Sequence, residues 1–251
     1  MATMDLCAAP AGYSQRAYNG DILPDCHTHS SEDDLRGHHT ICPANCRINY
    51  YWPRNGTGGP SYARIDTAGT LTSTPDWDIS INGSWNSANY SWGTATIGIG
   101  DPGVGDAFLV GPRIYVGLLN DDDTSPFGPK VYGVFVNAAG TSFSTPIFRV
   151  PETNHISPDY WSLDTTIRQY ISNSTGYVVL GNGTSRSVAL SGDFSGTYSR
   201  WESRHSGGGG SSSNNGGSGE GRVTASGAIT SIRISSAAHG PTVGFIGFGA
   251  F

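Results

Sequence analysis

Strand-forming residues dominate this chain of 251 residues. Isoleucine, valine, tyrosine, phenylalanine and tryptophan together account for 56 residues, whereas leucine, methionine, glutamine, glutamate and lysine account for 19. The first group favours strands and the second favours helices. Short runs of the first group recur about every ten residues, separated by glycine, proline, asparagine and aspartate. This spacing predicts an all-β protein, built as a β-sandwich or jelly roll rather than from alternating strands and helices.

Changes in texture along the chain predict its organisation. Residues 1–60 hold all four cysteines and five prolines and show no apolar periodicity, so we expect an extended, irregular N-terminal arm. Strand-like runs then predict one β-sandwich over 61–150 and a C-terminal β-sandwich over 166–251. The two sets of strands could instead build a single sandwich.

Two segments and two turns complete this prediction. We expect a proline-bounded linker at 151–165, followed by one or two turns of helix through TTIRQYI. Residues 206–219, SGGGGSSSNNGGSG, predict a flexible loop that buries no apolar surface. The pairs Asn82-Gly83 and Asn182-Gly183 each predict a two-residue hairpin turn, because both central positions of such a turn need positive φ.

The charge pattern argues against several classes of protein. Only 14% of residues are charged, the net charge is -6, and the arginines are scattered along the sequence, so we expect no binding to nucleic acid. No apolar run approaches the length of a membrane span. The first residues, MATMDLCAAPAGY, lack the basic and apolar regions of a secretory signal, so we expect folding in a cytoplasm.

A cysteine and histidine cluster is the most specific motif. Cys26, His29, Cys42 and Cys46 follow the pattern C-x2-H-x12-C-x3-C, which could place three thiolates and one imidazole around a structural zinc ion. Metal binding would order an arm too polar to fold without help. Two disulfides, or free thiols, are the alternatives that the spacing leaves open.

The remaining candidate residues are aromatic and acidic. Trp85, Tyr90 and Trp92 could form a platform for saccharide rings, although large aromatic residues of β proteins more often pack in the core. The acidic run 121–123 could bind calcium, but it lacks the spacing of a known calcium loop. No motif of a hydrolase, a nucleotide-binding enzyme or a metalloprotease is present, so we expect a protein that is not an enzyme.

Residues 168–251 contain YVVLGNGT, SGTYSRWESRHSGGGGSSS, GAITSIRISS and GFIGFG in that order. This part of the chain resembles the compact β-sandwich domain of bacteriophage virion proteins. The resemblance implies a structural virion protein of the tail fibre or baseplate type. It also implies a homotrimer that contacts other virion proteins and host surface polysaccharide. A capsid decoration protein and a carbohydrate-binding module are the two alternatives.

Overall fold

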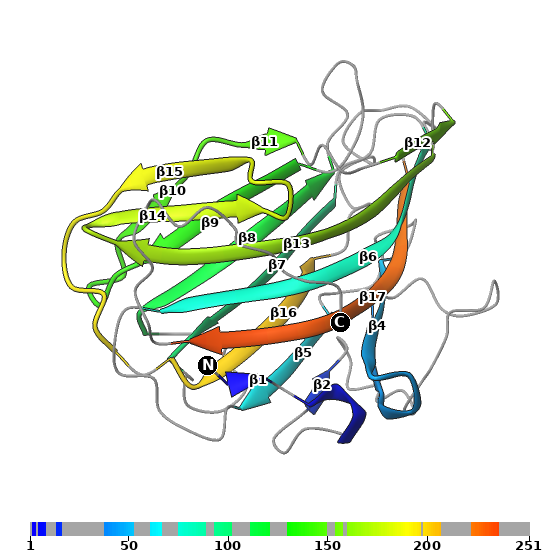
Figure 1. Ribbon diagram of the computed structural model, residues 1–251, viewed down its shortest axis with the longest axis horizontal. Helices are drawn as coiled ribbons and strands as arrows, with labels where there is room; N and C mark the ends of the chain where they lie inside the picture. Colours follow the sequence, from blue (N-terminus) through cyan, green and yellow to red (C-terminus); the bar gives the residue numbers. More distant parts are fainter. Residues whose placement is uncertain are drawn as a thin grey trace, which may run out of the picture.

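The structure is a computed structural model that describes residues 2–3, 5–8, 14–16, 38–52, 61–66, 75–88, 93–101, 111–120, 130–149, 154–157, 160–196, 198–206 and 222–235. These residues form two antiparallel sheets that pack face to face (Figure 1). The helical structure in the described ranges consists of two short 3-10 turns, η1 Leu6–Ala8 and η2 Pro43–Asn45. Neither turn is long enough to cross a membrane. The predicted all-β sandwich is therefore confirmed.

The first sheet, sheet A, faces the viewer in Figure 1. Its strands are β1 Ala2–Thr3, β3 His38–Cys42, β4 Arg47–Trp52, β6 Asp76–Ala88, β12 Asn154–Ser157, β13 Tyr160–Ser172, β14 Thr175–Leu180, β15 Ser185–Ala189 and β17 Arg222–Ser235. Their order is β15-β14-β13-β6-β17-β4-β3, with β1 paired to β17 and β12 paired to β13. The long strands β6, β13 and β17 form the centre of this sheet.

The second sheet, sheet B, lies behind the first in Figure 1. Its strands are β2 Ser14–Arg16, β5 Ser61–Asp66, β7 Gly93–Gly100, β8 Arg113–Asn120, β9 Lys130–Val136, β10 Ser142–Ser144, β11 Phe148–Arg149 and β16 Arg200–Ser206. Their order is β10-β9-β8-β7-β16-β5-β2, with β11 paired to β9. Strand β16 from the C-terminal part of the chain lies between β5 and β7.

The core fills the space between the two sheets. Successive side chains of a strand point to opposite faces, so every second residue of the central strands is buried. Sheet A contributes Trp77, Ile79 and Ile81 from β6, which lie in one cluster with the buried isoleucines of β7 and β8. The sheets approach closely at Gly133 of β9, where a Cβ atom would overlap the side chain of Val178 on β14. In sheet B, the residues that alternate with the buried ones therefore lie on its outer face.

Strand pairing shows one sandwich. Strand β6 pairs with β13 and with β17, and β7 pairs with β16, so strands from 61–150 and from 166–251 alternate within the same sheets. The expected linker at 151–165 contributes β12 and the start of β13. The expected N-terminal arm is also part of the sandwich, since β1, β3 and β4 join sheet A and β2 joins sheet B. The Gly/Ser loop predicted at 206–219 lies almost entirely outside the described residues.

Three local predictions have different outcomes. A turn does join β14 and β15 at Asn182-Gly183, but only Gly183 has a positive φ, of 86°, and the connection runs from Leu180 to Ser185, so it is longer than the two-residue turn that was predicted. The turn predicted at Asn82-Gly83 was wrong, because both residues lie inside β6 and pair with strands on either side. The helix predicted through TTIRQYI was also wrong: residues 165–171 belong to β13, in which Ile167 and Ile171 enter the core while Arg168 and Tyr170 lie on the other face.

Candidate binding face

The outer face of sheet B carries polar and aromatic residues around a strand of glycines. The described residues of this face, which we call the tyrosine face, are Thr96, Gly98, Gly100, Arg113, Tyr115, Gly117, Tyr132, Arg200 and Glu202. Each of them alternates along its strand with a core residue such as Ile97, Ile99, Ile114 or Trp201. Strand β7 is the centre of the face, with β16 on one side and β8 and β9 on the other.

Glycine lets the strands β7 and β8 approach each other closely on this outer face. Opposite Cβ atoms of an ordinary antiparallel pair lie about 4.5–5.5 Å apart. A Cβ atom added to Gly100 would lie 2.5 Å from the Cβ atom of Arg113, and one added to Gly98 would overlap Tyr115. The strands β7 and β8 therefore approach each other unusually closely on the outer side of sheet B. Glycine at these positions is required by the close approach and not by a positive φ.

Two tyrosines stand over this glycine-rich surface. The ring of Tyr132 crosses from β9 to β8, where it occupies the space that a side chain on Gly117 would fill. Tyr115 lies opposite Gly98, and both tyrosines are half-buried. Burial raises the pKa of both phenol groups, and the positive charge of Arg113 partly opposes this rise at Tyr115. Both hydroxyls are therefore neutral at pH 7 and can donate and accept hydrogen bonds.

Charged groups flank the glycine strand. Arg200 and Arg113 pair with Gly100 from opposite sides, so the two arginines occupy one row across the face. Glu202 and Tyr115 pair with Gly98 from opposite sides in the next row. The Glu202 carboxylate is buried, with Oε1 at 4.0 Å from Nη1 of Arg200. Nη1 of Arg113 donates a hydrogen bond of 2.9 Å to the Gly111 carbonyl oxygen, which helps to orient the guanidinium group.

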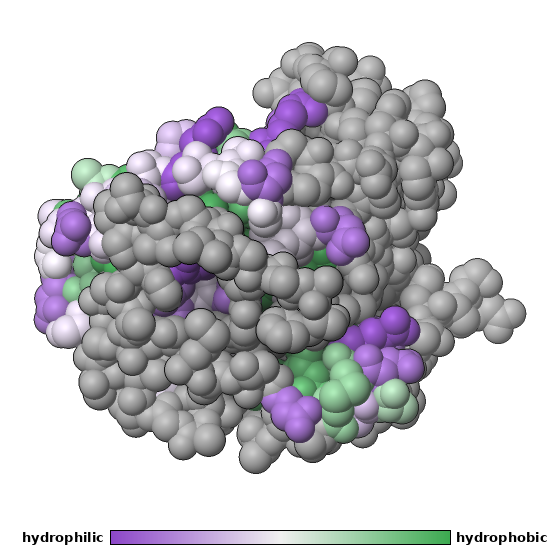
Figure 2. Space-filling view, viewed as in Figure 1, coloured by the Kyte–Doolittle hydropathy of each residue, from purple (hydrophilic) through white to green (hydrophobic). Residues whose placement is uncertain are grey.

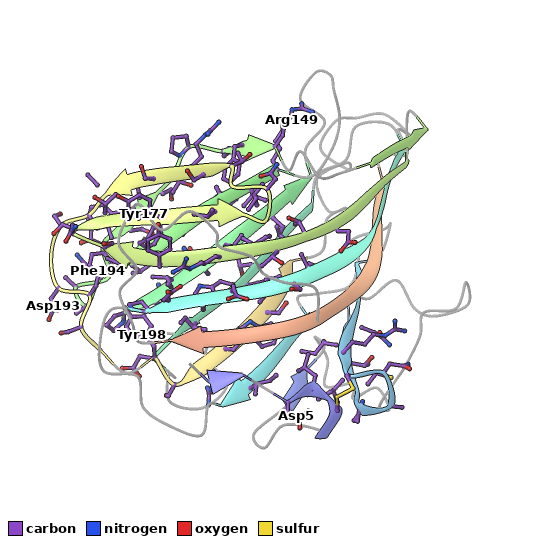
Figure 3. The ribbon with its side chains drawn as sticks, viewed as in Figure 1. Asp5, Arg149, Tyr177, Asp193, Phe194 and Tyr198 are labelled. Carbon is purple, nitrogen blue, oxygen red and sulfur yellow. A yellow bond between two sulfur atoms is a disulfide. The ribbon has the colours of Figure 1, made fainter. Side chains whose placement is uncertain are left out.

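The outer face of sheet A has a different character. Arg168 donates two hydrogen bonds to Asp76, Nε to Oδ1 at 2.9 Å and Nη2 to Oδ2 at 2.7 Å. The same guanidinium group lies 4.6 Å from the ring centroid of Tyr170, which stacks on Tyr177 with 4.9 Å between centroids (Figure 3). Asp76, Arg168 and Tyr170 are all buried. These side chains bind one another, so we assign this cluster a structural role.

The described part of the structure places one of the three predicted saccharide residues. Trp85 belongs to β6 in sheet A, where it pairs with Trp161 and with Ala225. Tyr90 and Trp92 lie outside the described residues. A saccharide platform of these three residues therefore stays a prediction.

The cysteines form disulfides in this structure. Cys7 on η1 is bonded to Cys46 at the end of η2, and Cys42 is also disulfide-bonded (Figure 3). A disulfide sulfur is not the thiolate that binds zinc. Cys42 and Cys46 are thus unable to serve in the predicted zinc site while oxidised, and the disulfide alternative holds for both. Cys26 and His29, the other two predicted ligands, lie outside the described residues.

The disulfide joins the first residues of the chain to sheet A. It connects η1, which follows β1, to the β3–β4 hairpin. Asp5 accepts a hydrogen bond of 2.9 Å from the Cys7 amide at the start of η1. Figure 2 shows apolar and hydrophilic residues side by side in this region. The predicted N-terminal arm is therefore held against the sandwich over its described part.

Sequence reasoning missed the tyrosine face. The signal was present in TIGIG of β7, where isoleucine and glycine alternate, and in the glycines within YVGLL and VYGVF of β8 and β9. Such alternation indicates a strand with one apolar face and one face that bears no side chain. The sequence does not reveal which strands lie beside these glycines, and therefore which side chains surround them.

Comparisons with known proteins identify no family for this chain. No protein-family model matches the chain, and no curated protein matches it. Solved structures with similar folds include the carbohydrate recognition domain of Emp47p, with 13% identity, a TM-score of 0.49, and 92% of this chain and 93% of that chain covered. Another is the lumenal domain of VIP36 in its Ca²⁺/Man3GlcNAc-bound form, with 11% identity, a TM-score of 0.46 and coverage of 83% and 85%. A Bacillus licheniformis β-glucanase matches with 10% identity, a TM-score of 0.45 and coverage of 90% and 98%.

The resemblance to bacteriophage virion domains was wrong. The similar solved structures just described include carbohydrate recognition domains and a glucanase, and none of these is a virion protein. Residues 168–251 also do not form a sandwich of their own, because β14, β15 and β17 belong to sheet A while β16 belongs to sheet B. The tail fibre, baseplate, decoration and homotrimer expectations depended on that resemblance and lose their basis with it.

Proposed function

We propose that this protein binds polysaccharide on the tyrosine face and does so without chemical conversion of its ligand. The observation that supports the proposal is the position of Tyr115 and Tyr132, two half-buried rings beside a glycine-lined strand pair. Aromatic rings pack on the apolar C–H faces of sugars, and adjacent polar groups bind the hydroxyls. Arg113 and Arg200 supply donors beside the rings.

The rows of the tyrosine face have the width of a sugar ring or two. Neighbouring strands are about 4.8 Å apart, so the rows extend about 10 Å from β16 across β7 to β8. Gly98 and Gly100 occupy the middle of these rows and present only backbone. A sugar ring over the face would meet Tyr115 and Arg113 on the β8 side of these glycines and Arg200 on the β16 side.

Affinity measurements on soluble polysaccharides test this function. The variants Tyr115→Ala and Tyr132→Ala, combined, should weaken binding about tenfold or more, because each lost aromatic contact contributes about 0.5–1.5 kcal/mol beyond its buried area. Tyr177→Ala is the matched control, since Tyr177 is also half-buried but lies on sheet A. The size of the polysaccharide and its reducing ends should stay constant during incubation. If the double variant binds as tightly as the Tyr177→Ala control, or if the polymer is cleaved, the proposal is contradicted.

A further inference from the structure

The basic residues of the chain gather on the face just described. Of the 14 lysine and arginine residues, seven lie in strands of sheet B, which hold only two acidic residues, Asp66 and Glu202. The seven are Arg16, Arg64, Arg113, Lys130, Arg149, Arg200 and Arg204. The arginines are scattered along the sequence, but strand pairing brings them together in a protein whose net charge is -6.

Four of the seven have described side chains, and these four occupy outward positions. Arg200 precedes the buried Trp201 of β16. Arg113 precedes Ile114, and Lys130 precedes Val131, both of which are in the core. Arg149 pairs with Lys130 on the same face. The outer face of sheet B therefore carries these four positive groups, and its strands hold half of the lysine and arginine residues of the chain.

The basic positions surround the glycine strand. Arg113 and Arg200 flank Gly100 in one row, and Arg204 lies across Thr96 and Gly117 from Tyr132 in another. Rows that face the same side are about 6.6–6.8 Å apart along a strand. Basic positions thus recur on both sides of β7, at spacings that suit a polymer with repeated negative groups. A neutral glycan would need hydroxyl-binding groups but no such accumulation of positive charge.

We infer that the ligand of the tyrosine face is an anionic polysaccharide, recognised through its carboxylate or sulfate groups together with its sugar rings. This inference rests on the proposed function. Guanidinium groups form paired hydrogen bonds with carboxylate and similar oxyanions. Glu202 lies beside Arg200, with Oε1 at 4.0 Å from Nη1, and can hold this side chain in place. The tyrosine rings beside the arginines favour a sugar polymer as the carrier of the negative groups.

Binding of four polymers to the full chain tests the inference. The probes are polygalacturonate for carboxylate, dextran sulfate for sulfate, neutral dextran, and oligo(dT) as a nucleic acid. We expect at least about tenfold tighter binding of one or both anionic polysaccharides than of dextran, and a loss of affinity as NaCl rises from about 50 mM to about 500 mM. The preferred anionic probe identifies the group that is recognised.

Two sets of variants locate the binding. Arg113→Gln with Arg200→Gln should weaken binding of the anionic polysaccharide at least about tenfold and reduce its salt dependence. Arg186→Gln, on the exposed strand β15 of sheet A, should change neither quantity. Unfolding midpoints establish that all variants are folded. If the arginine pair unfolds the protein, Lys130→Gln with Arg149→Gln at the edge of the same face serves instead.

The alternative outcomes are distinct. Equal, salt-independent binding of neutral dextran would overturn the inference about charge and leave the proposed function standing. Tighter binding of oligo(dT) than of both anionic polysaccharides would overturn the assignment to polysaccharide. Failure of every polysaccharide to bind would overturn both the inference and the proposed function.

Discussion

The side-chain amide of Gln169 on β13 bonds to the indole of Trp77 on β6: Oε1 of Gln169 accepts a hydrogen bond of 3.0 Å from Nε1 of Trp77. On its other side, Nε2 donates to the carbonyl oxygens of Tyr115 at 3.0 Å and Val134 at 3.1 Å, which belong to sheet B. Gln169 and Trp77 are almost fully buried. This amide thus links the two sheets through the core and holds the backbone behind Tyr115 in place.

Replacing Gln169 should destabilise the fold. Gln169→Leu leaves the Trp77 donor without a partner, and we expect a loss of about 2–4 kcal/mol in the free energy of unfolding, because an unsatisfied buried polar group costs about 1–3 kcal/mol. Urea denaturation measures this loss. In a Trp77→Phe background the same change should cost less, since the orphaned donor is gone. An equal cost in both backgrounds would show that the hydrogen bond is not the cause.

Filling the glycine surface should damage the binding face. Gly117→Ala places a methyl group where the ring of Tyr132 lies, so we expect the ring to be displaced, with about 1–3 kcal/mol of destabilisation from overpacking. Polysaccharide affinity should fall as well. Gly181→Ala is the control, because its added Cβ atom meets its nearest neighbour at an ordinary 3.5 Å. Unchanged affinity in Gly117→Ala would argue against a ligand over this strand.

Stability should decrease at alkaline pH because of Tyr198. Burial raises the pKa of this tyrosine far above its ordinary value, and its hydroxyl donates a hydrogen bond of 2.8 Å to the Phe194 carbonyl oxygen (Figure 3). The folded state therefore keeps a proton that the unfolded chain releases near pH 10. Linkage then requires the free energy of unfolding to be constant below about pH 10 and to fall above it. Urea titrations at several pH values should show a shallower fall in Tyr198→Phe; an identical slope would contradict this account.

Removal of the Cys7–Cys46 disulfide should also destabilise the protein. The bond spans 39 residues, and in the chain-entropy model a loop of this size contributes about 3–4 kcal/mol. We expect Cys7→Ser to lower the unfolding midpoint in urea, whereas Ser185→Ala, on the exposed strand β15, should not. Non-reducing digestion and mass spectrometry should find a Cys7–Cys46 peptide in the native protein. Free thiols at both positions of the native protein would contradict this prediction.

The fold class could be predicted from local patterns, but the sheet order could not. Alternation and turn residues indicated strands, and Asn182-Gly183 lies in the connection between the paired strands β14 and β15, although this connection is longer than two residues. At Asn82-Gly83 the neighbouring strands β13 and β17 pair with the whole of β6, and this long-range pairing overrides the local preference for a turn. The same pairing explains why TTIRQYI is a strand, with Ile167 and Ile171 buried on one side.

The candidate site depended on the strand pairing as well. Gly100, Arg113 and Arg200 lie far apart in sequence, and only the register of β7 with β8 and β16 places them in one row. The cysteine spacing was compatible with zinc and with disulfides, because spacing says nothing about the oxidation state of the sulfur atoms. Local sequence patterns predicted single residues and elements, whereas the binding face is a property of several strands together.

The most direct test of the account is to observe the tyrosine rings during binding. NMR spectra of protein with ¹³C-labelled tyrosine rings, assigned by single Tyr→Phe variants, should be recorded during titration with polygalacturonate and with dextran sulfate. The ring signals of Tyr115 and Tyr132 should shift and saturate, while those of Tyr170 and Tyr177 on sheet A stay unchanged. Shifts confined to Tyr170 and Tyr177, or no shift of Tyr115 and Tyr132 with any polysaccharide, would contradict the central claim that the outer face of sheet B binds the ligand.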